Sequence, residues 1–240
     1  MASLLYVGAR PELDAATAER ASFRVGLGVG SAQLDRIDLV AEPLPDDVFD
    51  RYDGFVIGGS PFNVTDVRKS ETQRRLEADL ERIAARAAEG ATAAFFTCFG
   101  IGVVTRLLGG IVTTDHPEEA SAAEVHTTGG ADPLFGPSGP KFSAFTAHKE
   151  GSTEVPPGAV LLATNDACPV QAYRVGDRLY ATQFHPEPSP RDFADRMVFY
   201  RTTGYFDPDA FDDVQDAVLA AAVTEPARIL GRFADLALSR

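Results

Sequence analysis

The sequence predicts an α/β protein with a mixed, mainly parallel sheet flanked by helices. Short apolar segments alternate with helix-like segments through the first part of the chain. Apolar segments then follow one another more closely after Gly110, and the C-terminal part returns to helical spacing. An alternation of strands and helices is typical of a parallel sheet covered by helices, because each element must bury its apolar side against another.

The alternating part predicts four strands and one long helix. The strands are expected at residues 4–7, 36–40, 54–57 and 91–97. The helix is expected at Glu71–Glu89, where Ser70 and Gln73 have the spacing of a capping box and Gly90 follows the last turn. Its apolar residues share one face: Leu76, Leu80, Ile83 and Ala87.

After Gly110 the pattern is rich in β-strand signals, and we expect the sheet to continue there with partly antiparallel strands. These strands are expected at residues 111–113, 122–127, 142–146, 160–163, 170–175 and 179–184. A helix is expected from Ser189-Pro190, with Asp192 in its first turn.

We expect one main domain over residues 1–204 and a helical extension over residues 205–240. Phe211, Val214 and Val218 indicate one helix of the extension, and Thr224 is placed to cap a second. The apolar stripe favours packing of these helices on the main domain. A surface for a partner or a second copy of the chain is the alternative.

Composition excludes several classes of protein. A formal net charge of -13 over 240 residues disfavours nucleic acid and anionic membranes as partners, since both require positive surface. The N-terminal segment lacks the basic start of a signal peptide, and the apolar runs are too short to span a membrane, so we expect a cytoplasmic protein. The 2 cysteines predict no disulfide framework, and the 4 histidines lack metal-ligand spacing. We therefore expect neither a metal nor a cofactor.

Cys98 is the first candidate catalytic residue. It lies where the apolar segment 91–97 meets a helix-like segment that begins at Phe99. A thiol at a strand-to-helix turn faces the free N–H groups of the helix, which favour the thiolate form. A small buried thiol with no catalytic role is the alternative on this segment alone.

His185 and Glu187 supply a base and its partner. The strand expected at 179–184 runs into His185, and Pro186 holds this residue in an extended conformation. Residues two apart in an extended chain point to the same side. Glu187 can therefore orient one imidazole nitrogen of His185 while the other nitrogen takes a proton from Cys98, as in a catalytic triad with sulfur as the nucleophile.

These segments resemble the class I glutamine amidotransferases, and most closely the stand-alone branch that is similar to the glutaminase domain of GMP synthetase. The family's elbow reads roughly Gly-x-Cys-x-Gly-x-Gln and its base segment reads His-Pro-Glu; Cys98, Gly100, His185 and Glu187 match. Further matches, spread over about residues 3 to 200, are Gly58-Gly59-Ser60, Ala147-His148 and the segment 168–174. The resemblance implies a flavodoxin-like amidotransferase fold.

The resemblance also implies the surroundings of the substrate. The backbone N–H of Phe99, by the geometry of the elbow, and that of Gly59, by the resemblance, are expected to form the oxyanion hole. Gly58, Ser60, Gly102 and His148 are expected to bind substrate. A surface loop histidine and an ordinary glycine turn are the alternatives for His148 and Gly59.

Two positions depart from the family pattern. Phe96 replaces a glycine two residues before the cysteine, and Gly102 replaces a glutamine that contacts the substrate. The first leaves the elbow more crowded. The second removes a polar group from the glutamine pocket, so we expect free glutamine to bind weakly.

The reaction implied is release of ammonia from glutamine or a γ-glutamyl amide through a cysteine thioester. The ammonia would pass to a separate synthetase, or the chain would simply hydrolyse a γ-glutamyl compound; a homodimer is also compatible with the sequence. The alternative from another class is a catalytically impaired binding or regulatory module, motivated by Phe96 and Gly102. A cysteine hydrolase of the related peptidase and chaperone superfamily is disfavoured, because there the base usually follows the nucleophile closely.

Overall fold

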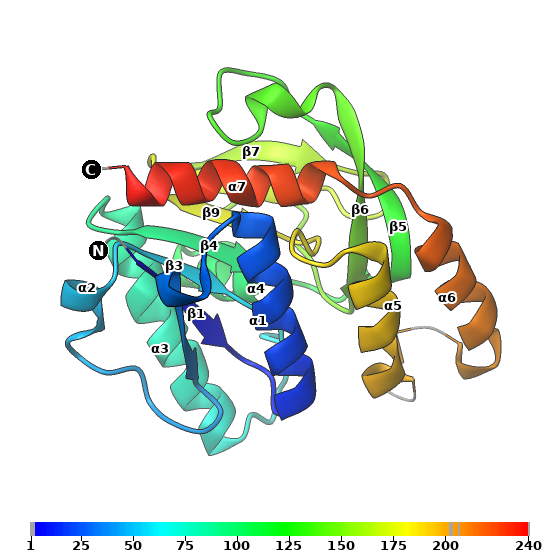
Figure 1. Ribbon diagram of the computed structural model, residues 1–240, viewed down its shortest axis with the longest axis horizontal. Coiled ribbons are helices and arrows are strands. Elements are labelled where there is room, and N and C mark those ends of the chain that lie inside the picture. Colours follow the sequence, from blue (N-terminus) through cyan, green and yellow to red (C-terminus); the bar gives the residue numbers. More distant parts are fainter. Residues whose placement is uncertain (1–2, 202–203, 206, 240) are drawn as a thin grey trace.

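A single nine-stranded sheet runs through the molecule (Figure 1). The computed structural model describes residues 3–201, 204–205 and 207–239. The strand order is β2-β1-β3-β4-β9-β8-β7-β5-β6. Neighbours from β2 to β9 are parallel, and neighbours from β9 to β6 are antiparallel. The mixed α/β fold predicted from the sequence is confirmed, with an antiparallel part as large as the parallel one.

The parallel half consists of short strands, and all of them except the edge strand are buried on both faces. They are β2 (Leu34–Asp38), β1 (Leu4–Gly8), β3 (Gly54–Ile57), β4 (Ala93–Thr97) and β9 (Leu179–Thr182). In β1, Leu5 and Val7 pack into one core cluster while Leu4 and Tyr6 pack into the other. Continuous apolar runs such as Leu4–Gly8 are what a central parallel strand requires, because helices cover both of its faces.

Two helices cover each face of this half. Helices α1 (Leu13–Leu27) and α7 (Glu225–Leu238) lie side by side on one face, as Figure 1 shows. Helices α3 (Glu71–Ala88) and α4 (Phe99–Leu107) pack together on the other. Phe233 of α7 packs edge-on against Phe95 of β4 with ring centroids 5.3 Å apart. The short α2 (Val48–Arg51) precedes β3.

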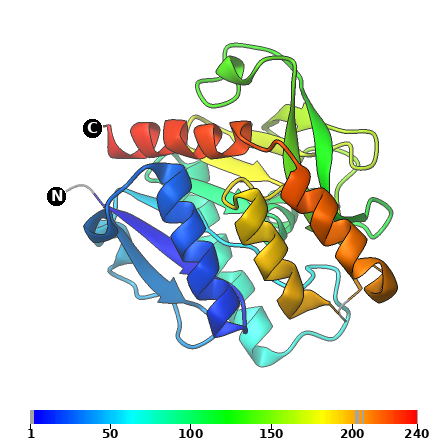
Figure 2. The same cartoon turned by 45° about the vertical axis from the view of Figure 1, so that its right-hand side comes forward.

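The antiparallel half extends the sheet beyond β9. It contains β8 (Ala172–Val175), β7 (Ala159–Thr164), β5 (Glu118–Thr127) and β6 (Lys141–His148). Helices α5 (Pro190–Met197) and α6 (Phe211–Ala220) lie next to each other and cover the β5 and β6 end (Figure 2). A third apolar cluster joins them to the sheet, and in it Phe145 and Phe193 stack at 4.5 Å.

Several boundaries differ from the sequence-based expectation. The strand expected at 111–113 is wrong: only Thr113 forms a bridge, to Gly151. The strand expected at 36–40 begins and ends two residues earlier, because the N–H groups of Ala41 and Glu42 turn back to donate to the Asp38 carbonyl. The Ser70 cap on Gln73 is present, but Thr224 makes no side-chain cap. Among the described residues, no helix is both long and apolar enough to cross a membrane.

Candidate active site

The candidate site lies where the carboxyl ends of four neighbouring parallel strands meet. Arg10 follows β1, Gly58-Gly59-Ser60 follows β3, Cys98 follows β4 and the segment 183–187 follows β9. Ligands of open α/β sheets bind outside the carboxyl ends of the strands, because the loops there are free to vary while the sheet holds them in place. The fold therefore brings the sequence-predicted residues to one edge.

Cys98 occupies a strained backbone conformation at the turn from β4 to α4. Its φ of 54° and ψ of -106° make it the one non-glycine residue with positive φ in the described part of the chain. Its backbone N–H donates to the Thr182 carbonyl at 2.8 Å, which ties the turn to β9. Strain of this kind persists only where the surroundings enforce it, and it presents the side chain above the sheet edge.

Phe96 does not prevent this turn. Its ring is fully buried in the core beneath α4, and a Cβ on Gly100 would lie 3.1 Å from both Cβ and Cδ1 of Phe96. The absence of a side chain at Gly100 therefore leaves the room that the Phe96 ring uses. The crowding that Phe96 was expected to cause at the elbow is relieved at Gly100, in the first turn of α4.

His185 and Glu187 are hydrogen-bonded to each other next to Cys98: the Nδ1 atom of His185 lies 3.1 Å from Oε1 of Glu187. The Cys98 side chain donates to the Ala147 carbonyl at 3.8 Å and borders the same cavity as the imidazole. The backbone N–H of His185 donates to the Phe145 carbonyl at 2.8 Å, so the residue is anchored to β6 as well as to β9. The extended geometry predicted from Pro186 places both side chains on the same side of the chain.

The electrostatic environment favours a charged pair at His185 and Glu187. Burial by itself lowers the pKa of His185, but the carboxylate of Glu187 and then the interaction with Cys98 raise it to about 9. Burial by itself raises the pKa of Glu187, whereas His185 and then Arg196 lower it well below its usual range. An imidazolium next to an ionised carboxylate is therefore the stable state near neutral pH.

A second buried carboxylate, Glu19 of α1, was not found by sequence reasoning. Its side chain is inaccessible to solvent, and its Oε2 accepts a hydrogen bond from Tyr6 Oη at 2.7 Å. Its Oε1 accepts from Arg10 Nη2 at 2.8 Å and from Arg196 Nη1 at 3.3 Å. The same Arg196 Nη1 atom lies 2.5 Å from Oε1 of Glu187. Arg196 thus links Glu19 to the carboxylate that orients His185.

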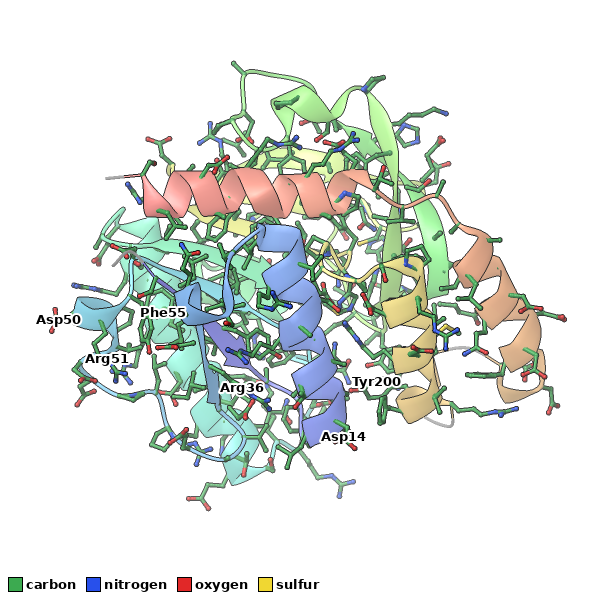
Figure 3. The ribbon with its side chains drawn as sticks, in the orientation of Figure 1. Asp14, Arg36, Asp50, Arg51, Phe55 and Tyr200 are labelled. Atoms are coloured by element: carbon green, nitrogen blue, oxygen red, sulfur yellow. The ribbon has the colours of Figure 1, made fainter. Side chains whose placement is uncertain are left out.

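This network also includes Tyr200, which Figure 3 labels between the ends of α1 and α5. Arg10 Nη1 donates to Tyr200 Oη at 2.8 Å.

The sequence does contain a signal for this network of buried charges. Glu19 interrupts the buried face of α1, and Arg196 lies between Phe193 and Met197 on the buried face of α5. A charged residue inside an apolar stripe is rare unless it is paired.

The expected oxyanion donor Gly59 is already engaged. Its N–H donates to Glu19 Oε1 at 3.2 Å, so it would have to leave that carboxylate to reach a substrate. A Cβ on Gly59 would lie 2.8 Å from His185 Cε1. A residue with a side chain would therefore collide with the imidazole, which explains why glycine occupies this position. The neighbouring Ser60 borders Cys98, and its N–H has no hydrogen-bond acceptor among the residues with described positions.

Two cavities flank Cys98. A polar cavity contains the predicted substrate-binding residues Ser60, Gly102 and His148, together with Phe99. A largely apolar cavity contains Ser60 and His185. Gly58 borders neither cavity within the described chain: a Cβ there would lie 2.1 Å from Glu19 Oε2, so Gly58 makes room for the buried carboxylate.

The position of the family glutamine is filled by other groups. A Cβ on Gly102 would lie 3.0 Å from Val64 Cγ2 and 3.3 Å from Glu150 Oε1. Glu150 is buried, which raises the pKa of its carboxyl group against the hydrogen bonds that it accepts from Val64 and Thr65. The replacement of the family glutamine by Gly102 therefore leaves no empty space, because Val64 occupies it and the carboxyl group of Glu150 borders it.

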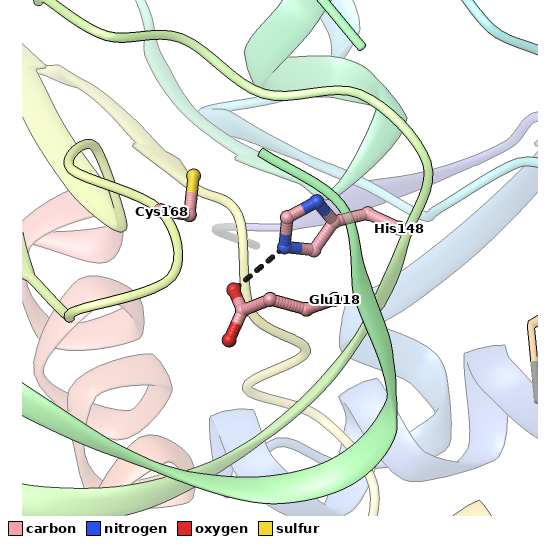
Figure 4. A group of neighbouring side chains, drawn as sticks. All are labelled: Glu118, His148 and Cys168. Carbon is pink, nitrogen blue, oxygen red and sulfur yellow. Dashed lines mark hydrogen bonds and ion pairs between the residues drawn. The ribbon is translucent and has the colours of Figure 1, made fainter. Parts of the chain in front are cut away.

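His148 borders the polar cavity and belongs to a buried polar cluster with Glu118, which Figure 4 shows beside Cys168. Its Nε2 lies 2.7 Å from Oε2 of Glu118, and its Nδ1 lies 2.9 Å from the Glu150 carbonyl oxygen. Both ring nitrogens therefore bond within the protein, and His148 fixes the wall of the cavity. Asn165 and Gln171 donate to the same Glu118 carboxylate.

Two groups of side chains have the donor types of a metal site. They are Glu118 with His148 and Cys168, and Glu19 with His185 and Glu187, each within 4.8 Å. Hydrogen bonds from His148, Asn165 and Gln171 engage both oxygens of Glu118, and arginine side chains hold the carboxylates of the second group. In each group the carboxylates are thus already held by hydrogen bonds or ion pairs, although Glu187 Oε2 has no partner among the described residues.

The fold and the site define an α/β protein with a cysteine at a strand-to-helix elbow, next to a histidine and a carboxylate. The model of the family described as glutamine amidotransferase class-I matches residues 27–203. This chain belongs to that family.

Two kinds of curated relative are similar to parts of the chain. Gamma-glutamyl peptidase 3 of Arabidopsis thaliana is 27% identical over 172 residues, which are 67% of this chain and 65% of the relative. The GMP synthase of Albidiferax ferrireducens is 35% identical over 98 residues, which are 38% of this chain and 18% of the synthase. The chain thus spans only about a fifth of the length of the GMP synthases that it matches.

Solved structures agree on the fold. A glutamine amidotransferase of Methylobacillus flagellatus has a TM-score of 0.70 at 15% identity, with 100% of this chain and 96% of that one covered. A glutamine amidotransferase of Thermotoga maritima has a TM-score of 0.72 at 14% identity, with 98% of both chains covered. At these identities the likeness shows the fold.

The two cysteines should differ in reactivity. Burial raises the pKa of Cys168 to about 11, whereas Cys98 borders both cavities and shares one of them with the imidazole of His185. Iodoacetamide near neutral pH should therefore label Cys98 first, as read by peptide mapping. Faster labelling of Cys168 would contradict this assignment of the nucleophile.

Glu19 should be essential for stability. Glu19→Gln leaves Arg10 buried without the carboxylate that it pairs with and leaves Arg196 with Glu187 alone, and breaking a buried ion pair costs about 3–5 kcal/mol of unfolding free energy. Urea unfolding measures the loss. The matched control is Asp195→Asn on α5, whose pair with Arg191 is exposed and should leave the midpoint unchanged. Equal midpoints for both variants would refute the structural role of Glu19.

Proposed function

We propose that this chain hydrolyses the γ-carboxamide of glutamine or of a substituted γ-glutamyl amide through a thioester on Cys98. The observation that carries the proposal is the strained backbone of Cys98 beside a hydrogen-bonded imidazole, at the carboxyl edge of the sheet. Strain at this one side chain is the mark of a nucleophile held for attack. Family membership supports the same reaction class.

The first step is acylation. The Cys98 thiolate attacks the γ-carbonyl carbon, and the carbonyl oxygen takes the negative charge. The imidazolium of His185 then gives its proton to the amide nitrogen, so that the C–N bond breaks and an amine or ammonia leaves. Glu187 holds the imidazole through Nδ1 and offsets its positive charge.

The second step is hydrolysis of the thioester. Neutral His185 removes a proton from a water molecule, whose oxygen attacks the thioester carbonyl. The C–S bond breaks, glutamate leaves, and the Cys98 thiolate and the His185 imidazolium are restored. Atoms and charge balance over the two steps, with water as the single co-reactant.

The oxyanion needs donors that are fixed before the reaction. We assign Phe99 N–H, at the start of α4, as the first donor. For the second donor we favour the Ser60 N–H over that of Gly59, because Gly59 donates to Glu19. Both Phe99 and Ser60 border the polar cavity at Cys98.

The polar cavity is suited to the amino-acid end of a γ-glutamyl group. Lys149 and Glu150 both border it, and they provide a cation and a carboxyl group for the oppositely charged groups of an α-amino acid. Gly102 and His148 form part of its wall. The cavity has a volume of about 10 Å³, roughly the space of one water molecule, so we assign it to the acyl part of the substrate with its lining side chains displaced on binding.

The nitrogen-containing product depends on which γ-glutamyl compound is the substrate. With glutamine, the product is ammonia, and a separate synthetase is the acceptor that we propose; the GMP synthases that match this chain are named as glutamine-hydrolysing. With a substituted amide, the amine itself is the product and no synthetase is needed. The relative named gamma-glutamyl peptidase, of which the chain covers 65%, favours the second arrangement.

Variants of the three residues test the proposal. Cys98→Ala should form no acyl-enzyme, and His185→Asn should lower acylation by about three orders of magnitude or more, whereas Glu187→Gln should retain measurable activity. Intact-protein mass spectrometry with glutamine and γ-glutamyl amides detects the Cys98 adduct, and release of ammonia or amine gives the rate. No adduct with any donor in the wild-type chain would instead favour a binding module.

Acylation should have an alkaline limit set by His185. The imidazolium form is the proton donor, and its pKa of about 9 means that kcat/KM should fall as the pH rises through this value. In Glu187→Gln the carboxylate no longer raises the pKa of His185, so the alkaline limb should move to lower pH. Single-turnover rates over pH 6 to about 10 measure both profiles. A limb that does not move would show that another group limits acylation.

A further inference from the structure

The two cavities at Cys98 differ in which catalytic group they contain. Ser60, Cys98 and Tyr205 border both of them. Phe99, whose N–H is assigned to the oxyanion, borders the polar cavity, whereas His185 borders the apolar cavity. The nucleophile therefore has an oxyanion side and a proton-donor side.

This arrangement determines where the departing nitrogen goes. A general acid must come within hydrogen-bond distance of the atom that it protonates. The amide nitrogen must therefore point toward His185 when the C–N bond breaks, and any substituent on this nitrogen must enter the apolar cavity. The acyl group is left on the polar side, next to Glu150 and Lys149.

The wall of the apolar cavity consists mainly of hydrocarbon and aromatic groups. They come from β5, the end of β6, α5 and the segment after it: Ala120, Ala147, Phe193, Met197 and Tyr205. The volume is about 40 Å³. A buried water needs roughly 10–15 Å³, so the cavity accommodates about three heavy atoms. The stacked pair of Phe145 and Phe193 fixes one side of it.

The charged residues at this cavity balance one another. Arg10 and Arg196 both border it, and their guanidinium groups pair with Glu19 and Glu187. Two buried cations face two buried carboxylates, and the imidazolium of His185 faces the thiolate of Cys98 in the proposed mechanism, so no net charge is left to attract an ionic substituent. Arg196 keeps two N–H groups, on Nε and Nη2, with no acceptor in the described part of the chain. A carboxylate on the substituent is therefore the competing ligand that an experiment must separate.

We propose that the apolar cavity is a subsite for the leaving group, and that it selects γ-glutamyl amides of small, uncharged, apolar amines over glutamine itself. The inference rests on the proposed function, because it assigns the second half of the same substrate. The amine nitrogen lies at His185, and its short alkyl chain contacts Ala120, Phe193 and Met197. Burial of this chain assists acylation and has no effect on hydrolysis of the thioester, which is the same for every donor.

Four donors that differ only beyond the amide nitrogen test this subsite. They are glutamine, γ-glutamylethylamide, γ-glutamylglycine with a carboxylate, and γ-glutamyl-(2-aminoethyl)amide with an ammonium group. Single-turnover acylation of Cys98 is measured for each by intact-protein mass spectrometry. We expect the ethylamide to acylate at least about tenfold faster than glutamine, and both charged donors to be slower than the ethylamide.

A substitution in the wall separates the subsite from the catalytic groups. Ala120→Leu fills part of the cavity, so the preference for the ethylamide over glutamine should fall toward one. Ala122→Leu is the matched control: it lies on the same strand and packs on α5 and α6 without bordering the cavity. The control should keep the wild-type ratio.

The outcomes are distinct. Equal rates for glutamine and the ethylamide, or a ratio that Ala120→Leu leaves unchanged, would overturn the subsite while the proposed function stands. Fastest acylation by γ-glutamylglycine would show that Arg196 binds a carboxylate and would overturn the preference for uncharged amines. No acylation of Cys98 by any donor would remove the proposed function and this inference with it.

Discussion

The positive φ of Cys98 is the constraint on which the site depends. A residue with a Cβ adopts this conformation only when its neighbours hold it there. Here the hydrogen bond from Cys98 to Thr182 joins the turn to the adjacent parallel strand, and α4 begins immediately afterwards. The close packing of Phe96 on Gly100 and of His185 on Gly59 then allows no extra side chains at those glycines. The proposed nucleophile, its proposed base and the nearby backbone donors are therefore held by the turns that follow three neighbouring strands.

Buried charge is the second organising feature. Glu187 orients the imidazole, but it is itself held by Arg196, and Arg196 in turn contacts Glu19. These side chains come from α1, α5 and the segment after β9, so the network joins parts of the chain that are far apart in sequence. Ion pairs removed from water are strong only when each partner remains in place. The arrangement of His185 and Glu187 is therefore a property of the packed domain, and α5 is part of it.

The antiparallel half of the sheet gives the site its substrate side. Strands β5 and β6 and helix α5 supply the wall of the apolar cavity, while the end of β6 and the residues after it supply the wall of the polar one. His148 bonds to Glu118 and to the Glu150 carbonyl, so it fixes the loop that carries Glu150 into the polar cavity. A pocket whose polar groups are held by buried hydrogen bonds discriminates between substrates because those groups cannot rearrange at low cost.

The sequence by itself determined the alternating strands, the capped helix at Glu71, the elbow at Cys98 and the pair of His185 and Glu187. Each of these depends on local rules of periodicity, capping and strand alternation. Only the tertiary structure decided that Glu19 and Arg196 enter the site, that the Gly59 N–H is engaged, and that Glu150 fills the space beside Gly102. These features join residues that are distant in the chain, and their partners are set by how α1, α5 and the loop after β6 pack, which no local pattern encodes.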